Sequence, residues 1–401
     1  MKKNRILYLG LFVLCLLFIY FYGGKVPYML FYTIILLPVL SISLTLIAFL
    51  RFKYIQEVDK SNVVKGEEVN FSFSMHNEDF LLYPYIKINF CSSDTVFVEQ
   101  FQSKSFSLLP FKKKTFSFKL ACKYRGDYLI GIESIEFEDY LGIVKFNHKP
   151  FGTKQITVQP RLVKLDRLHI KTNFLSESHS ILSNQYEDTT TIADIRKYAY
   201  GDSLKRIHWK LSSKMNQLLV KNFEGTSKTN SVIILDLKRN RYTFEQNAMI
   251  EDKLIECAVA IIYYLLSNWI PINLIYYRKG FNDLEAKNTL QFDDIYQTLS
   301  KVKFDEDIDV KDVLDIYVKN NSLKKTDILL FTLNLNYELY DEIYKAKLSG
   351  YDVNLIYVSP ENVIGTCNTE INNILKELPE IGVTTYRIDI EDDIKMIFEH
   401  S

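Results

Sequence analysis

The segment from residue 194 to residue 221 is the densest polar part of the 401-residue chain and holds the side chains best suited to chemistry. These are Asp194, Arg196, Tyr198, Gly201, Asp202, Arg206, His208, Trp209, Lys210, Ser212 and Ser213. Its aspartates and arginines could fix the shape of a loop, because Arg binds a carboxylate through two parallel hydrogen bonds. Its basic side chains beside a tryptophan could instead dock an acidic protein or a phosphate, since Arg and Trp are favoured at interface anchors.

A hydrolase-like site is the catalytic alternative for the same segment. His208 could act as a general base that Asp202 orients, with Ser212 or Ser213 as the nucleophile. No G-x-S-x-G sequence supports this arrangement, and a histidine between isoleucine and tryptophan is more often structural. The segment therefore predicts a structural or docking motif, with catalysis as the alternative.

The local backbone of this segment can also be predicted. Gly201 and Asp202 mark a tight turn, where Gly tolerates positive φ and Asp bonds the backbone nearby. If residues 206–210 are extended, Ile207 and Trp209 share one face of the strand. Trp209 would then be a packing anchor.

Two apolar stretches at the start of the chain predict a membrane hairpin within residues 1–54. Residues 6–22 and 26–50 carry no charged side chain, and about 20 apolar residues cross a bilayer as a helix. Only three residues separate them, which leaves room for a tight turn alone. A cleavable signal peptide is the competing interpretation, but no A-x-A-like site follows the first stretch and the second would still stop transfer.

Basic residues at the outer ends of the two stretches predict their orientation. Three Lys or Arg precede the first stretch, Arg51 and Lys53 follow the second, and the tip holds only Lys25. Because such positive flanks stay in the cytoplasm, a multi-pass protein of the inner or plasma membrane with both termini cytoplasmic is expected. The five scattered cysteines, without a C-x-x-C pair, fit a reducing compartment.

Two further domains and a connecting segment follow the hairpin. Residues 58–165 alternate between apolar and polar side chains, as in half-buried antiparallel strands, and predict an immunoglobulin-like or fibronectin-like β-sandwich. Residues 231–401 alternate short apolar runs with helical stretches, which predicts a doubly wound α/β domain with a parallel sheet. The polar motif lies in the segment between them, residues 166–230. In such a sheet a ligand would bind beyond the carboxyl ends of the strands, so Asp236, at the end of the first strand, is a candidate.

The overall charge argues against nucleic acid as a partner. The chain has 49 Lys and Arg against 49 Asp and Glu, whereas nucleic-acid-binding proteins normally carry a basic excess. No G-x-x-x-x-G-K-[ST] motif is present, so the chain is not expected to hydrolyse ATP itself.

The polar motif resembles the signature of a known bacterial family, the domain of unknown function 58 (DUF58) family. That signature reads R-x-Y-x-x-G-D-x-x-R-x-I-H-W-K, and residues 196–210 match its fixed positions except one, where Lys205 stands in place of arginine and Arg206 follows it. Further motifs that resemble those of the family occur upstream in the same order, at Arg125-Gly-x-Tyr128, Asp139-Tyr-Leu-Gly142 and Val158-Gln-Pro160-Arg161. The resemblance covers most of the chain after the hairpin.

The resemblance implies an architecture and a setting but no reaction. Members of the family typically carry two membrane spans, a β-sandwich and a von Willebrand factor A-like domain of Rossmann type. Their genes usually lie beside one for a MoxR-type AAA+ ATPase and often beside one for a transglutaminase-like membrane protein. These two proteins are therefore the partners that the resemblance implies, together with the lipid bilayer.

The same resemblance raises the question of a metal site. Von Willebrand A domains usually bind magnesium through D-x-S-x-S after the first strand, because Mg²⁺ prefers oxygen ligands. This chain has Asp236, Lys238 and Asn240 at those positions, and the Lys238 ammonium would repel a dication or pair with Asp236. We predict a degenerate site without metal or other cofactor; the alternative is magnesium on Asp236, Asn240 and Thr332.

These observations predict a membrane-anchored, cytoplasm-facing scaffold or adaptor. It would work with a MoxR-type AAA+ ATPase in assembling protein complexes or the cell envelope, with the 194–221 motif as its docking site. The alternative is a membrane-associated hydrolase or phosphate-handling enzyme that uses His208 and Asp202.

Overall fold

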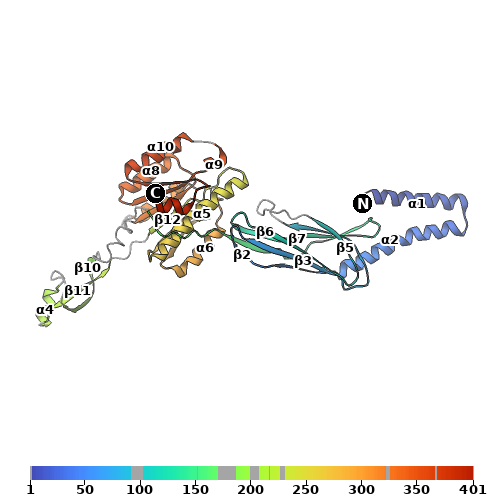
Figure 1. Ribbon diagram of the computed structural model, residues 1–401, viewed down its shortest axis with the longest axis horizontal. Helices are drawn as coiled ribbons and strands as arrows, with labels where there is room; N and C mark the ends of the chain where they lie inside the picture. Colours follow the sequence, from blue (N-terminus) through green and yellow to red (C-terminus); the bar gives the residue numbers. More distant parts are fainter. Residues whose placement is uncertain are drawn as a thin grey trace. The chain divides into compact units, whose positions relative to one another are not determined.

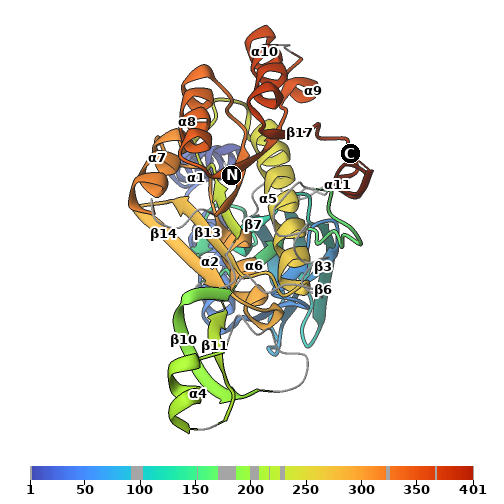
Figure 2. The same ribbon diagram turned by 90° about the vertical axis from the view of Figure 1, so that its left-hand side faces the viewer.

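The computed structural model describes residues 2–91, 103–150, 152–169, 187–198, 207–215, 217–225, 231–321, 326–365 and 368–400. The chain divides into two compact units, Met1–Arg161 and Leu162–Ser401 (Figures 1 and 2). The first holds two apolar helices and a β-rich region, and the second holds the polar motif and an α/β sheet. This division does not test the finer boundaries at residues 54, 165 and 230, which stay predictions.

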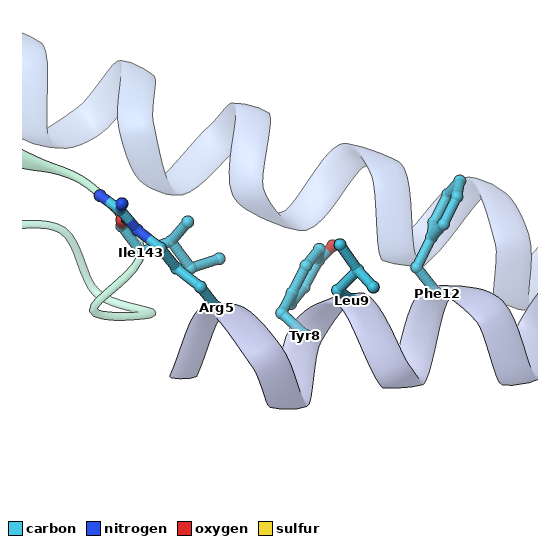
Figure 3. Close-up of a pocket in the computed structure, with 5 residues that line it drawn as sticks. All are labelled: Arg5, Tyr8, Leu9, Phe12 and Ile143. Atoms are coloured by element: carbon cyan, nitrogen blue, oxygen red, sulfur yellow. The ribbon is translucent and has the colours of Figure 1, made fainter. Parts of the chain in front are cut away.

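The first unit begins with the hairpin of α1 (Lys2–Tyr22) and α2 (Lys25–Arg51), within which both apolar stretches lie. Each helix is long and apolar enough to cross a membrane. The helices run antiparallel: the Tyr8 hydroxyl donates to the carbonyl of Ile34, and the rings of Phe12 and Phe31 lie 5.9 Å apart. Figure 3 shows the groove along α1, of about 220 Å³, between its side chains and Ile143.

The β-rich region forms two sheets, of order β1-β3-β6 and β2-β9-β7-β4-β5, with β8 paired to β7. The strands are β1 (Lys53–Val58), β2 (Asn62–Val64), β3 (Glu68–His76), β4 (Tyr83–Cys91), β5 (Lys104–Leu108), β6 (Lys113–Ala121), β7 (Gly126–Glu138), β8 (Lys145–His148) and β9 (Lys154–Gln159). Apolar residues of both sheets form one buried cluster, to which alternate residues of β3 from Val69 to Met75 contribute. The predicted alternation therefore holds.

The hairpin is fixed to this β core within the unit. Only Phe52 separates α2 from β1, and its ring lies 4.9 Å from that of Phe137. Further along α2, the Ser41 hydroxyl donates to the buried carboxylate of Asp139 at 2.8 Å. The same carboxylate accepts the backbone N–H groups of Ile143 and Val144. The Asp139-Tyr-Leu-Gly142 motif thus shapes a loop that holds α2.

The second unit contains a six-stranded sheet of order β14-β13-β12-β15-β16-β17. Its strands are β12 (Ser231–Leu235), β13 (Ile272–Tyr277), β14 (Phe281–Ala286), β15 (Asp327–Thr332), β16 (Asp352–Val358) and β17 (Thr384–Ile388). All neighbours pair in parallel except β13 and β14. The expectation of a wholly parallel sheet is wrong at this edge, because the three residues 278–280 can join antiparallel strands but cannot form a crossover.

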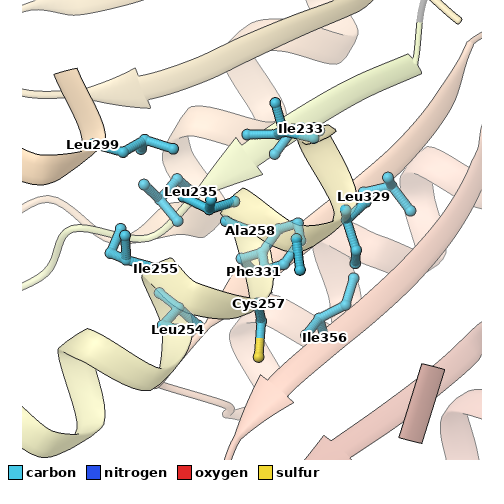
Figure 4. Close-up of a cluster of buried hydrophobic side chains, with 14 of the residues drawn as sticks. Ile233, Leu235, Leu254, Ile255, Cys257, Ala258, Leu299, Leu329, Phe331 and Ile356 are labelled. Carbon is cyan, nitrogen blue, oxygen red and sulfur yellow. The ribbon is translucent and has the colours of Figure 1, made fainter. Parts of the chain in front are cut away.

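Helices cover both faces of this sheet. One buried cluster joins its first face to α5 (Phe244–Ser267), α6 (Phe292–Lys301) and α11 (Ile394–His400) (Figure 4). Another joins the second face to α7 (Val310–Asn320), α8 (Tyr337–Leu348) and α10 (Thr369–Glu377) (Figure 2). Residues of β12 alternate between these clusters, as expected for a strand that is buried on both sides. A short helix, α9 (Glu361–Ile364), follows β16.

The polar motif forms a separate two-stranded antiparallel sheet in this unit. Its strands are β10 (Glu187–Lys197) and β11 (Leu219–Gly225), and the short helix α4 (Trp209–Met215) precedes β11. We call the described residues 187–198, 207–215 and 217–225 the signature ribbon.

Candidate functional site

Two places in the second unit hold the candidate residues: the carboxyl edge of the six-stranded sheet and the signature ribbon. At the edge, β12 pairs with β13 on one side and with β15 on the other, so the order of the strands reverses there. Ligands of open α/β sheets bind at such a reversal, beyond the carboxyl ends of the strands. Asp236 directly follows β12, and Thr332 ends β15.

Asp236 is buried and its carboxylate is satisfied by neighbouring donors. The Thr332 hydroxyl donates to Oδ2 at 2.6 Å, the Asn334 amide donates to the same oxygen at 3.2 Å, and the backbone N–H of Lys238 donates to Oδ1 at 3.0 Å. Burial raises the pKa of the Asp236 carboxyl above its ordinary value, and these three hydrogen bonds oppose the shift without cancelling it. Donors from neighbouring residues of the same chain therefore hold the Asp236 carboxylate in place.

Lys238 does not form the predicted pair with Asp236. Its ammonium group pairs with Asp309, which lies at the N-terminus of α7. The backbone carbonyl of Asn240 accepts a hydrogen bond at 3.2 Å from the side chain of Asn247 on α5. The edge thus brings Asp236 and Thr332 together, while the described contact of Asn240 is with a helix.

The edge does not fit a magnesium ion. An octahedral Mg²⁺ site needs several oxygen ligands that face one point, whereas Asp236 faces the donors of Thr332, Asn334 and Lys238. Within the described part of the chain, no group of three or more His, Cys, Asp or Glu side chains is placed to hold a metal. The absence of a cofactor stays a prediction.

In the signature ribbon, β10 and β11 place Arg196 opposite Val220. Arg196 is exposed, and its guanidinium donates to the carbonyl of Lys197 at 3.4 Å. The backbone N–H of Tyr198 donates to the carbonyl of Leu218 at 2.9 Å. Ile207 is buried and forms a β-bridge to Val220.

His208 and the serines are engaged in local bonds. The N–H of Leu211 donates to Nδ1 of His208 at 3.2 Å, so this histidine caps the first turn of α4. Ser212 is buried, and its hydroxyl accepts the N–H of Leu219 at 2.9 Å. The Ser213 hydroxyl donates to the carbonyl of Lys210 at 3.2 Å. These contacts tie α4 to β11 and direct both hydroxyls toward backbone groups.

Trp209 is not the packing anchor that an extended backbone would make it. It is the first residue of α4, and 65% of its surface is exposed. Lys210 beside it is exposed as well, and so are the apolar side chains of Met215 and Leu218. The ribbon therefore shows an aromatic and aliphatic surface next to basic groups.

Part of the predicted motif cannot be placed. Gly201, Asp202 and Arg206 lie outside the described residues, as does the side chain of Asp194. The predicted network of carboxylates and guanidinium groups, and the pairing of His208 with Asp202, therefore stay predictions.

The sequence reasoning missed several residues that the structure brings to these sites: Asp309 and Asn334 at the edge, and Met215 and Leu218 on the ribbon. Asp309 is 71 positions from Lys238 in the sequence, so no local sequence pattern predicts their ion pair. The sequence could have indicated Asn334, because it lies two residues beyond Thr332, at the end of the strand. From there its side-chain amide reaches the Asp236 carboxylate.

Comparison with known proteins gives one family and one curated relative. The model described as "Protein of unknown function DUF58" matches residues 194–279, from the signature ribbon to the turn after β13. "Uncharacterized protein YeaD" of Bacillus subtilis (strain 168) is 20% identical over 265 residues. The match covers 62% of this chain and 61% of the relative, so it spans about three fifths of that protein's length.

Two solved structures show only a weak similarity to this chain. Proximal thread matrix protein 1 from the mussel byssus has a TM-score of 0.29 at 15% identity, with 43% of this chain and 47% of that chain covered. The alkylpurine DNA glycosylase AlkC of Pseudomonas fluorescens, bound to DNA with an abasic site analog, has a TM-score of 0.19 at 13% identity. That match covers 34% of this chain and 40% of the other.

Proposed function

We propose that this chain, which belongs to the DUF58 family, is a membrane-anchored scaffold that docks a partner protein through its signature ribbon on the cytoplasmic side. The observation that carries this proposal is the exposed Trp209. It lies on a ribbon whose nearby polar groups, His208 and Ser212, are engaged in backbone bonds. Aromatic and Met side chains are enriched at protein interfaces, and Trp is among the commonest hot spots.

The anchor is the α1–α2 hairpin. Both helices have the length and composition of membrane spans, and Lys and Arg gather at the outer ends of the pair. By the positive-inside rule, the β-rich region and the second unit would lie in the cytoplasm. An inner-membrane or plasma-membrane location follows from this orientation.

We also propose finer identities for the two folded regions. Two sheets around one core support an immunoglobulin-like sandwich for the β-rich region. In the second unit, the order of the strands reverses between β12 and β15, which supports a Rossmann-type, von Willebrand A-like domain. In this proposal the A-like domain lacks the usual magnesium, because its edge is occupied by internal donors.

The partner that we propose is a MoxR-type AAA+ ATPase, with a transglutaminase-like membrane protein as a further candidate. This assignment rests on the family resemblance of the motif. The exposed lysines near Trp209, Lys210 and Lys214, suit an acidic surface on such a partner. The process served would be the assembly of protein complexes or of the cell envelope.

The contacts of the ribbon favour docking over the hydrolase alternative. A Ser–His nucleophile needs the hydroxyl within hydrogen-bond reach of the imidazole. Here Ser212 bonds the backbone of Leu219, Ser213 bonds that of Lys210, and His208 caps α4. We therefore assign His208 a role in shaping the ribbon.

The proposal can be tested by photo-crosslinking of the full chain in membranes. A photoreactive amino acid replaces Trp209 in one variant and Trp269 in another, since the chain has 2 Trp and the second, 68% exposed, lies outside the ribbon. The expected result is a crosslink to the MoxR-type ATPase from position 209 and none from position 269. Identical products from the two positions would overturn the docking role of the ribbon.

A further inference from the structure

Two loops lie at the end of the β-rich region where α2 enters it. One comprises residues 77–82, between β3 and β4, and the other residues 109–112, between β5 and β6. The side chain of Asn77 joins them, because its amide donates to the carbonyls of Leu81 and Leu109 at 2.7 and 3.1 Å. The end of α2 is joined to the first loop by an ion pair of 3.0 Å between Arg51 and Asp79.

These loops expose large apolar side chains. Phe80 is 87% exposed, and Leu109 and Phe111 are each 59% exposed. The rings of Phe80 and Phe111 meet edge to face at 4.9 Å, so they form one aromatic tip that spans both loops. Because these two rings stay exposed, they bury little apolar surface when the chain folds. Exposed apolar surface of this kind marks a site that another apolar phase covers.

The backbone at Phe111 adopts a conformation that disfavours a side chain. Phe111 has a φ of 55°, and the N–H of Lys112 bonds the carbonyl of Leu109 across Pro110. Proline at the second position and positive φ at the third are the signature of a type II turn, in which glycine is strongly favoured at the third position. A phenylalanine at a turn position that favours glycine indicates that its side chain has a functional role.

The exposed apolar surface of α2 continues to these loops. Leu46, Ile47 and Leu50 remain exposed in the last two turns of α2, on the side that the β core leaves uncovered. Leu50 is 72% exposed and directly precedes Arg51, the residue that pairs with the Phe80 loop. The surface suited to lipid therefore extends along α2 as far as the aromatic tip.

Basic groups surround the tip. Lys53, His76 and Lys113 lie in one row across β1, β3 and β6. Residues 51–53, 76–82 and 109–114 together carry five Lys or Arg against Glu78 and Asp79, which pair with Lys53 and Arg51. Aromatic side chains beside basic ones suit the interface of an anionic bilayer, where rings sit at the headgroup level and cations meet lipid phosphates.

We propose that this end of the β-rich region is a bilayer-docking surface, in which Phe80, Leu109 and Phe111 enter the headgroup zone and Lys112 and Lys113 contact anionic lipid. This proposal rests on the proposed membrane anchor. It adds that the β-rich region lies against the membrane, held there by a second contact besides the hairpin.

The test uses the full chain in vesicles that contain a brominated lipid, which quenches nearby tryptophan. The background variant carries Trp209→Phe and Trp269→Phe, and single tryptophans are then introduced. Phe80→Trp probes the docking surface, and Leu14→Trp probes the middle of α1. Leu129→Trp is the matched control, because Leu129 is exposed on β7 at the end of the sheet away from these loops.

The expected result is strong quenching at position 14, clear quenching at position 80 and none at position 129. Quenching at position 14 with position 80 as unquenched as position 129 would overturn the docking surface and leave the anchor intact. No quenching at position 14 would overturn the anchor and, with it, this proposal.

Two further variants separate lipid contact from folding. Phe111→Gly relieves the backbone at a positive φ, so the folded chain should keep its thermal stability in detergent while quenching at position 80 falls at least twofold. Lys112→Glu with Lys113→Glu should reduce this quenching in anionic vesicles more than in zwitterionic ones, whereas Lys119→Glu, exposed further along β6, should not. Unchanged quenching in both variants would contradict the proposal.

Discussion

The carboxyl edge of the six-stranded sheet and the signature ribbon use their polar residues in opposite ways. At the edge, the buried Asp236 receives three hydrogen bonds from its own neighbours. On the ribbon, His208, Ser212 and Ser213 bond the backbone, and Trp209 is left exposed. The difference teaches that a ligand position known from other α/β sheets can be filled by internal donors, while an exposed aromatic side chain lies on a separate two-stranded sheet.

Replacement of Trp209 should have the largest effect on partner binding. Trp209→Ala removes the exposed side chain that we propose as the interface anchor, and loss of a hot spot costs about 2 kcal/mol or more, which is about 30-fold in affinity. The affinity of the full chain in nanodiscs for the purified ATPase measures this. Trp269→Ala is the control and should bind as the wild type does; equal losses in both variants would refute the special role of the ribbon.

At the edge, Thr332→Val should reduce stability and leave partner binding unchanged. The substitution removes the 2.6 Å donor to the buried Asp236 carboxylate and leaves only the longer bond from Asn334 to that oxygen. A hydrogen bond to a charged group contributes about 1.5–3 kcal/mol. Urea unfolding followed by tryptophan fluorescence reports on this unit, because Trp209 and Trp269 both lie in it. Thr298→Val, at an exposed hydroxyl on α6, should cost less than half as much. A weaker affinity for the ATPase in Thr332→Val at full folding would show that the edge takes part in docking.

Within the ribbon, Ser212→Ala should have a smaller effect on stability. The buried hydroxyl accepts the N–H of Leu219, and loss of one such bond costs about 1 kcal/mol. Ser213→Ala, at the exposed neighbour, should be close to neutral. Protection of the Leu219 amide in hydrogen exchange measures the difference. If both variants behave alike, Ser212 does not hold α4 to β11.

The pH dependence of stability should distinguish Asp236 from an ordinary surface carboxylate. Burial raises the pKa of Asp236 in the folded chain above its unfolded value. Its contribution to stability is therefore fully present below the unfolded pKa, about 3.9, and is lost as the pH rises through the folded pKa. Asp236→Asn does not titrate, so its stability relative to the wild type should improve as the pH rises across this range. A decline over the same range would mean that the folded pKa is lowered.

Much of the fold follows from local patterns. The strands at Asp327–Thr332 and Asp352–Val358 contain continuous apolar runs of the sequence, as expected for strands that are buried on both faces. The β14 strand was missed, since an edge strand with alternating exposed residues has no such run. Its antiparallel direction is set by the short loop before it.

The candidate sites were less predictable than the fold. The sequence placed Asp236 and Thr332 together only as alternative magnesium ligands, whereas their direct hydrogen bond depends on the parallel pairing of β12 with β15. The partner of Lys238 is Asp309, which only the folded chain brings near. The extended backbone assumed for Trp209 was wrong, because α4 begins at this residue and His208 caps its first turn. The side chain of Trp209 is exposed as a result.

The topology of the hairpin tests the central claim most directly, since the ribbon can meet a cytoplasmic ATPase only if it lies in the cytoplasm. One epitope is inserted between Gly23 and Gly24 and another is fused after Ser401, and protease is added to cells whose outer surface is accessible but whose inner membrane is intact. We expect the first epitope to be digested and the second to be protected. Digestion of the epitope after Ser401 with protection of the one at the tip would contradict this expectation.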